Sequence, residues 1–226
     1  MKDIVIIDGL RTPYVKAGTA LKDVTADSLG AFVIRELIDR TGMDPALADE
    51  VIVGNAGMPA EAANIARVIA LRAGIPQPTP AYSVQRNCAS GMQALSSACA
   101  QIAAGLSSVV LSAGVESMSN FGFYTTKRLK EIFTAIGRSK TLWGKVKAGM
   151  SIRPRDIVPV VGLQVGLTDP VSGFNMGQTA EKLARDFGIS RREQDTFALQ
   201  SHRRWTDANA SGKFRNEIIP VYVPPK

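Results

Sequence analysis

Short apolar runs alternate with longer amphipathic stretches over the first 114 residues. The apolar runs have the length of buried strands, which predicts strands at 3–8, 50–55, 81–85 and 107–112. The longer stretches carry apolar residues at helical spacing, which predicts helices at 26–40, 62–73 and 89–104. Strands separated by helices of this length indicate βαβ units. We therefore expect an α/β fold with a mostly parallel sheet.

The pattern changes after Gly114. Residues 115–174 are rich in glycine, proline, serine and basic residues, with two short helical stretches at about 126–136 and 141–148. An excursion of this length within a compact domain is usually functional. Regular helix resumes at 176–187, and a capping box of Ser190 and Glu193 begins a further helix that extends to about residue 210. A last strand is predicted at 217–223.

These changes divide the chain into three predicted parts. Residues 1–120 form an α/β core, 121–215 form an inserted domain, and 216–226 begin a strand that returns to the core. No apolar run approaches the roughly 20 residues that a membrane-spanning helix needs. The first residues enter a strand-like run without the architecture of a signal peptide, so we expect a cytoplasmic protein.

The net charge of +7 is concentrated in one segment of the predicted inserted domain. Residues 127–155 contain nine lysines and arginines and one acid, Glu131, so the rest of the chain is nearly neutral. This segment has no zinc-finger, RNP-like or aromatic-platform pattern, and we expect no nucleic-acid partner. Its interspersed apolar residues favour a helical pair that faces a protein partner or an anionic membrane, with a phosphate-rich substrate at its edge. A plain solvated face is the alternative.

The two cysteines have different surroundings. Cys88 lies where the third predicted strand gives way to a helix, followed by the small residues 89–91. Unpaired amide groups and the positive end of a helix dipole favour the nucleophilic thiolate and can stabilise an oxyanion. Cys99 lies within the helix on an apolar stripe, which indicates core packing. A buried structural role is the alternative for Cys88.

Five motifs together resemble the thiolase family. Residues 87–94 (NCASGMQA) are similar to its nucleophile motif, N-C-x-S-G-x-x-A. The other four follow the family's order along nearly the whole chain: 11–13 (RTP), 114–119 (GVESMS), 175–181 (NMGQTAE) and 188–198 (GISRREQDTFA). The segment 167–173 (LTDPVSG) and the basic insertion most resemble long-chain 3-ketoacyl-CoA thiolases of fatty-acid oxidation complexes.

The resemblance implies a βαβαβαββ half of a thiolase, interrupted by a loop domain that helps to bind coenzyme A. Cys88 would carry the acyl group as a thioester, for thiolysis of a 3-ketoacyl-CoA or for condensation with acetyl-CoA. Asn175 and Met176 would line the acyl pocket, although packing at a helix start explains Met176 equally well. The resemblance also implies a homo-oligomer that uses acyl-CoA as substrate, with no metal and no permanently bound cofactor.

Several parts of the family pattern do not occur in these 226 residues. The G-H-P histidine that acts as base, the N-E-A asparagine and the C-x-G cysteine are missing, and the single histidine, His202, is expected on a helix surface. We therefore expect the C-terminal half to be absent, and 1–226 to be inactive unless another chain supplies that half. Two other readings stay open: a non-catalytic thiolase-like interaction module, and a decarboxylating ketoacyl synthase.

Overall fold

The computed structural model describes residues 3–223. It divides into two compact units, Met1–Asn120 with Phe197–Lys226, and Phe121–Thr196. The division into domains after residues 120 and 215 stays a prediction. The compact units differ from it in assigning residues 197–215 to the first unit.

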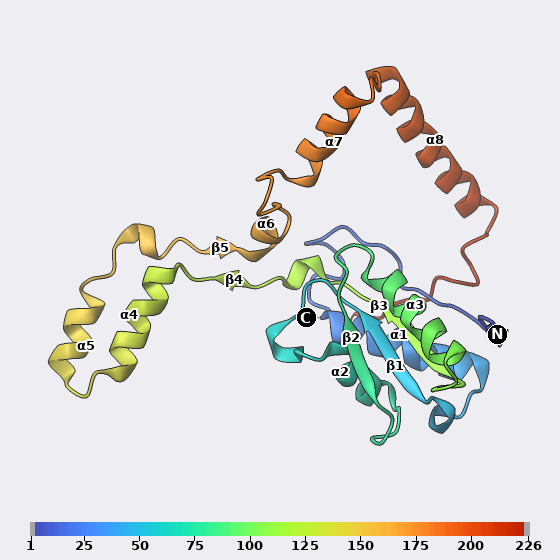
Figure 1. The fold of residues 1–226 in the computed structure, drawn as a ribbon, viewed down its shortest axis with the longest axis horizontal. Coiled ribbons are helices and arrows are strands. Elements are labelled where there is room, and N and C mark those ends of the chain that lie inside the picture. The colour runs from blue at the N-terminus through green and yellow to red at the C-terminus, as the bar shows by residue number, and fades with distance from the viewer. Residues whose placement is uncertain (1–2, 224–226) are drawn as a thin grey trace. The chain divides into compact units, whose positions relative to one another are not determined.

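A three-stranded parallel sheet forms the centre of the first unit (Figure 1). Its strands are β1 (Glu50–Gly54), β2 (Ala81–Val84) and β3 (Val110–Gly114), in the order β2-β1-β3. The predicted α/β fold with a parallel sheet is confirmed, and three of the predicted strands form. β3 begins later than predicted, because the Ser108 and Val109 amides bind the Asp49 carboxylate instead of extending the ladder.

Helices cover both faces of this sheet (Figure 1). On one face lie α1 (Ala26–Thr41) and α2 (Ile65–Ala73), and on the other lies α3 (Ser90–Ala103). Because side chains alternate along a strand, Val51 and Val53 pack with α1 and α2, whereas Ile52 packs with α3. All three side chains are completely buried, so β1 is the core of the unit.

Glycines in the left-handed conformation end two of these helices. Gly42 has φ 64° after α1, and Gly74 has φ 90° after α2, a backbone region that glycine enters without steric cost. The first unit also has three short 3-10 helices, Pro45–Leu47, Ala60–Ala62 and Met118–Asn120.

Two predicted strands are wrong. No strand forms at 3–8, where Val5, Ile6 and Ile7 are 74–80% exposed. At 217–223 the described chain makes one isolated bridge, between Arg11 and Ile218. An apolar run becomes a strand only when a neighbouring strand satisfies its backbone groups, and a sequence pattern does not show whether that neighbour is present.

The second unit is built from a short ribbon and helices. β4 (Phe123–Tyr124) pairs antiparallel with β5 (Val160–Val161), and between them lie α4 (Lys127–Arg138), α5 (Leu142–Gly149) and the 3-10 helix Pro154–Asp156. After β5 come α6 (Gly162–Gly166), α7 (Met176–Asp186) and the start of α8 (Arg191–Ala210). The helices predicted in this part of the sequence are therefore confirmed. None of the described helices has the length and apolarity needed to cross a membrane.

Candidate active site

Cys88 lies in the tight turn between β2 and α3, and it is exposed. Asn87 has φ 48°, a left-handed conformation that asparagine tolerates better than most residues. Two backbone hydrogen bonds close the turn, from Ala89 N to Arg86 O at 3.0 Å and from Ser90 N to Asn87 O at 3.1 Å. The chain therefore reverses sharply at Cys88 and leaves its thiol accessible.

Ser90 fixes this turn from within. Its side chain is buried, and its Oγ accepts the Arg86 amide at 2.8 Å and donates to the Asn87 carbonyl at 2.6 Å. The sequence indicated Ser90 as a small neighbour of Cys88. The structure adds that its hydroxyl bonds to both sides of the cysteine turn, which a one-dimensional motif does not reveal.

Three glycines let the start of α3 lie directly on the sheet. A Cβ built on Gly54, at the end of β1, would overlap the backbone carbonyl of Ser90, and one on Gly114, at the end of β3, would lie 2.8 Å from the Gly91 Cα. Side chains here would push the helix away from the strands. Because Gly54, Gly91 and Gly114 have no side chains, the start of α3 packs directly on the ends of β1 and β3. This close packing fixes the position of the Cys88 turn relative to the sheet.

Glu116 joins the carboxyl ends of β1 and β3 beside this turn. Its Oε2 accepts the amides of Ala56 and Gly57, each at 3.0 Å, and its Oε1 accepts Asn55 Nδ2 at 3.2 Å. Asn55 is buried, and its Nδ2 also donates to the Val115 carbonyl at 2.8 Å. In parallel α/β sheets this edge is where ligands bind. The motif 114–119 contained Glu116, but the sequence assigned it no role.

The first turn of α3 has no side-chain cap. Ala89, the residue before the helix, makes no capping hydrogen bond, whereas Asn64, Thr126 and Asn175 each accept an amide at the start of their helices. An uncapped helix start keeps amide donors available for an anion. The amides of Ala89 and Ser90 are already used within the turn, so the donors left for an anion belong to the next residues of the first helical turn.

The other predicted site residues belong to different parts of the molecule. Asn175 and Met176 lie in the second unit, where Asn175 Oδ1 accepts Gln178 N and Gln178 Oε1 accepts Asn175 N, each at 2.9 Å. Asn175 thus has a structural role as a helix cap, and Met176, 57% exposed, begins α7. Cys99 is half-buried within α3, and His202 is exposed on α8. Among residues 3–223 no cluster of three His, Cys, Asp or Glu side chains could hold a metal ion.

A family model described as the thiolase N-terminal domain matches residues 4–226. The chain belongs to the thiolase family. The resemblance carried by the five motifs is therefore confirmed. A 3-ketoacyl-CoA thiolase of Pectobacterium carotovorum is 38% identical over 98% of this chain, and one of Yersinia enterocolitica is 36% identical over the same share.

Solved thiolase structures have the same fold. An acetyl-CoA acetyltransferase of Bacillus anthracis matches 96% of this chain with a TM-score of 0.81 and 35% identity. A thiolase of Ascaris suum, in complex with coenzyme A, matches 94% with a TM-score of 0.78 and 30% identity. This thiolase domain spans about half the length of each of these four relatives.

Proposed function

We propose that this thiolase domain supplies the nucleophile of an acyl-CoA acyltransferase, with Cys88 as the acyl carrier. The observation that supports this most is the placement of an exposed thiol before the uncapped start of α3, at the carboxyl edge of a parallel sheet. In the first step, the Cys88 thiolate attacks the thioester carbonyl of an acyl-CoA. A bond forms between Sγ and the acyl carbon, and coenzyme A leaves as its thiolate.

The acyl-enzyme takes part in two reactions. In thiolysis it forms instead when Cys88 attacks the 3-keto carbonyl of a 3-ketoacyl-CoA: the bond between C2 and C3 breaks, and acetyl-CoA leaves as its enolate and is protonated. The thiolate of coenzyme A then attacks the Cys88 thioester, which releases an acyl-CoA shortened by two carbons and restores the Cys88 thiolate. In condensation, a carbanion of acetyl-CoA attacks the Cys88 thioester, the Cys88 thiolate leaves, and a 3-ketoacyl-CoA is released. In both, negative charge develops on the carbonyl oxygen, and the free amides at the start of α3 are suited to stabilise it. Asn175 and Met176 would line the acyl pocket, and the working enzyme would be a homo-oligomer.

The base and the second cysteine of this reaction would come from a thiolase half outside residues 1–226. The single histidine, His202, is exposed on α8, and within residues 3–223 no hydrogen bond orients its ring toward a nucleophile. We therefore expect purified 1–226 to show no steady thiolysis of acetoacetyl-CoA. Steady turnover by 1–226 alone would contradict this part of the proposal.

A chimaera tests the role of Cys88. Residues 1–226 are followed by the C-terminal half of the Pectobacterium carotovorum thiolase, and thiolysis of acetoacetyl-CoA is measured. Cys88→Ser should lower kcat by at least about 1000-fold, because a serine hydroxyl ionises far less readily than a cysteine thiol and is a far weaker nucleophile. Cys99→Ser is the matched control and should retain activity. The proposal fails if a chimaera that is active with Cys88 keeps that activity in Cys88→Ser.

Trapping the intermediate gives a second test. Incubation of the chimaera with acetyl-CoA, followed by acid quenching and peptide mass spectrometry, should place an acetyl thioester on the peptide that contains Cys88. An acetyl group found on Cys99 instead would show that Cys88 is not the acyl carrier, and would reject the mechanism.

A further inference from the structure

Among residues 3–223, two residues other than glycine have a left-handed backbone, and both follow strands at the carboxyl edge of the sheet. They are Asn87 in the Cys88 turn, with φ 48°, and Met58 after β1, with φ 41°. This conformation is unfavourable for a side chain such as methionine, and it persists only where other contacts hold it. Strained residues of this kind gather at functional sites, which indicates that the 55–58 loop belongs to the same functional edge as Cys88.

Two side chains hold this loop in its strained shape. Asn55, which is 2% exposed, accepts the Met58 amide on its Oδ1 at 2.7 Å. Glu116 Oε2 accepts the two amides between them, those of Ala56 and Gly57. Because a side-chain oxygen binds each of these three amides, the conformation of the loop depends on Asn55 and Glu116.

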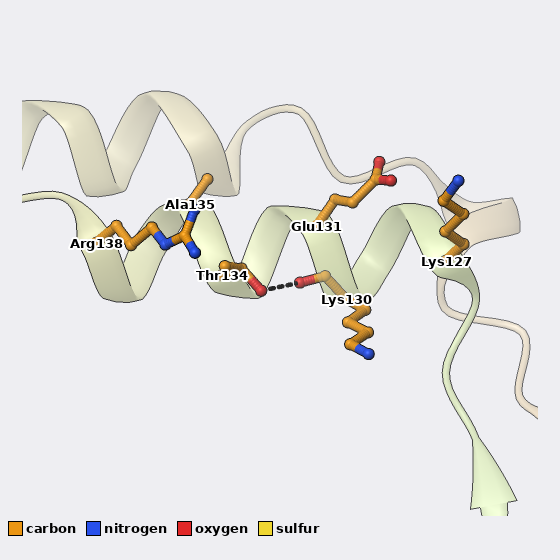
Figure 2. A pocket seen from close by; sticks show the side chains of 6 residues that line it. All are labelled: Lys127, Lys130, Glu131, Thr134, Ala135 and Arg138. Atoms are coloured by element: carbon orange, nitrogen blue, oxygen red, sulfur yellow. Dashed lines mark hydrogen bonds between the residues drawn. The ribbon is translucent and has the colours of Figure 1, made fainter.

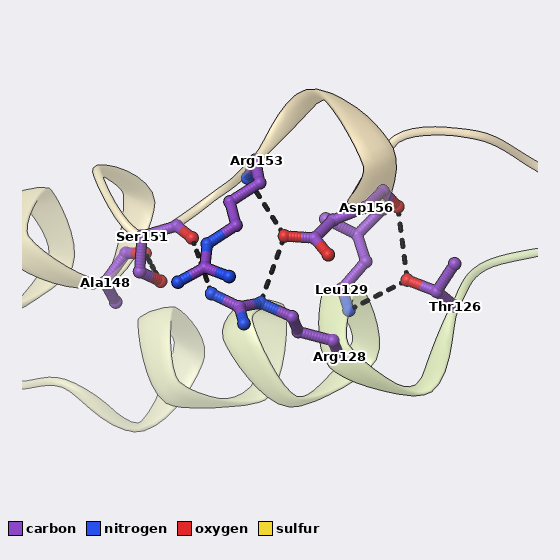
Figure 3. Close-up of polar contacts among 7 residues, drawn as sticks. All are labelled: Thr126, Arg128, Leu129, Ala148, Ser151, Arg153 and Asp156. Carbon is purple, nitrogen blue, oxygen red and sulfur yellow. Dashed lines mark hydrogen bonds and ion pairs between the residues drawn. The ribbon is translucent and has the colours of Figure 1, made fainter.

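The Glu116 carboxylate differs in its partners from the buried carboxylate of Asp156 in the second unit. Asp156 Oδ2 accepts the Arg153 amide at 2.9 Å and also lies 3.0 Å from Arg128 Nε (Figure 3). Within the described chain no cation pairs with Glu116, whose partners are N–H donors of the loop. Replacing Glu116 therefore leaves no opposite charge without a partner, and its direct effect falls on the loop.

The same loop contacts the residues on both sides of the Cys88 turn. Gln85 directly precedes the turn, and its Nε2 donates to the Ala56 carbonyl at 3.4 Å. Gly54, the last residue before the loop, lies so close to Ser90 that an added Cβ would overlap the Ser90 carbonyl. A shift of the loop would therefore move both ends of the turn.

The Cys88 thiol lies at an open edge. One hollow of the surface lies on α4 (Figure 2) and another beside α1, and Cys88 lines neither of them. Since the thiol is exposed, its direction depends on the turn that carries it and on the contacts that hold this turn. Such control matters for catalysis, because a misplacement of about 1 Å can lower a rate about 100-fold.

We propose that Glu116 is a positioning residue of the acyl transfer, which holds the Cys88 turn through the 55–58 loop and Gln85. Its carboxylate keeps the loop in the strained conformation, so that Sγ meets the acyl carbon in a reactive geometry. This inference rests on the proposed role of Cys88 as acyl carrier, and the two fail separately. Without acetylation of Cys88 in the unsubstituted chimaera the proposed function fails. If acetylation occurs but does not depend on Glu116, only this inference fails.

The rate at which excess acetyl-CoA acetylates Cys88 in the chimaera, followed by mass spectrometry, tests the proposal. Glu116→Ala should slow acetylation at least about tenfold and reach the same final fraction, because the nucleophile is misplaced but present. Glu116→Gln should stay within about threefold of the unsubstituted rate, since its one oxygen can accept both loop amides. Glu61→Ala, an exposed position with the same charge change, is the control and should leave the rate unchanged.

Three results of this experiment would overturn the proposal. One is an unchanged rate in Glu116→Ala. Another is a smaller final fraction at an unchanged rate, which would mean that Glu116 only keeps the protein folded. The third is equal slowing in Glu116→Gln, which would assign the effect to the charge instead of the held loop.

A double-mutant cycle tests the route through Gln85. Gln85→Met keeps the length of the side chain and removes its hydrogen bond to the Ala56 carbonyl. If Glu116 acts through this contact, Glu116→Ala should slow acetylation by less than about twofold further in the Gln85→Met chimaera. Effects that multiply independently would show that the carboxylate acts by another route, and would contradict the proposal.

Hydrogen exchange of the 1–226 chain gives a measurement that needs no second thiolase half. Glu116→Ala should accelerate exchange in the 55–58 loop and in residues 86–90, and should leave α1 and α2 unchanged. Acceleration in the loop alone would show that Glu116 does not act on the Cys88 turn. Acceleration throughout α1 and α2 would show a general loss of stability. Either result would reject Glu116 as a positioning residue.

Discussion

Helices α3 and α5 both have small residues at their buried positions, but α3 is held firmly on a sheet whereas α5 leaves most of its surface exposed. In α3, Ala94 and Ala98 pack on Ile52 of the central strand, and Gly91 approaches Gly114. In α5, Gly144 and Ala148 are the half-buried positions of a helix that contacts one other helix. In α3 the small residues permit close approach to the sheet, whereas a Cβ on Gly144 of α5 would meet Ser139 and Thr141 in the loop before the helix. What differs is the partner, a sheet with a second helical layer for α3 and a single helix for α5.

This difference separates two uses of a helix. Contact with a layered sheet fixes the start of α3 in position, which is what a nucleophile in the preceding turn needs. Contact with one helix leaves most of the α5 surface uncovered. A helix face of glycine and alanine therefore accompanies a fixed position of the nucleophile in the first unit, and exposed apolar side chains on α5 in the second unit.

The largest contrast is expected from truncating one apolar side chain in each unit. Ile52→Ala removes a completely buried side chain between β1 and α3 and should lower the free energy of unfolding by about 2–5 kcal/mol. Leu142→Ala removes an exposed one and should change it by less than about 0.5 kcal/mol. Urea unfolding followed by circular dichroism measures both. Equal losses would mean that the Leu142 side chain is covered in solution, contrary to its exposure in the structure.

A methyl group added between α3 and the sheet should have the next largest effect. Gly54→Ala would place a Cβ against the Ser90 backbone and should cost about 1–3 kcal/mol, because the backbone must shift to make room. In the active chimaera it should also reduce turnover, since the Cys88 turn moves with Ser90. Gly9→Ala, where nothing lies within 4 Å of the added Cβ, is the control. If Gly54→Ala matches this control in stability and turnover, the glycine contacts do not set the position of Cys88.

Loss of the Arg128 guanidinium should affect the second unit alone. Arg128→Met leaves the buried Asp156 carboxylate without its ion pair and should cost this unit about 1–3 kcal/mol. Hydrogen exchange should then accelerate in α4 and α5 and stay unchanged in α3. Lys130→Met, on the solvent side of the same helix, provides the comparison and should alter exchange little. Faster exchange in α3 as well would show that the two units do not respond separately.

The smallest expected effect concerns pH and the first unit. Hydrogen bonds from the Val109 and Ser108 amides lower the pKa of Asp49. A carboxyl whose pKa is lower in the folded state stabilises the protein above its unfolded pKa, and this contribution is lost as the pH falls below about 4. Asp49→Asn should therefore make the urea midpoint less dependent on pH between neutrality and acid. Asp3 is exposed, so the control Asp3→Asn should leave the pH dependence of the urea midpoint unchanged. If Asp49→Asn also leaves it unchanged, other carboxyl groups cause the loss of stability in acid.

The sequence by itself determined the α/β class, three strands of the sheet, most helices and the family. Apolar periodicity identifies these elements because strands and helices bury one side each, and the motif around Cys88 carries the resemblance in a few adjacent residues. It also located the cysteine before a helix, since that depends on neighbours along the chain.

Only the tertiary structure decided the contacts between residues that are distant in sequence. The runs at 3–8 and 217–223 look like strands, but pairing depends on a partner that no local pattern specifies. The roles of Gly54, Gly114 and Glu116 arise where strand ends meet α3 and the loop after β1. For α5 the sequence left two alternatives, an outward-facing apolar side and a plain solvated face. Packing decided that Leu142 and Trp143 are exposed, because periodicity shows that a helix has an apolar side but not which way it faces.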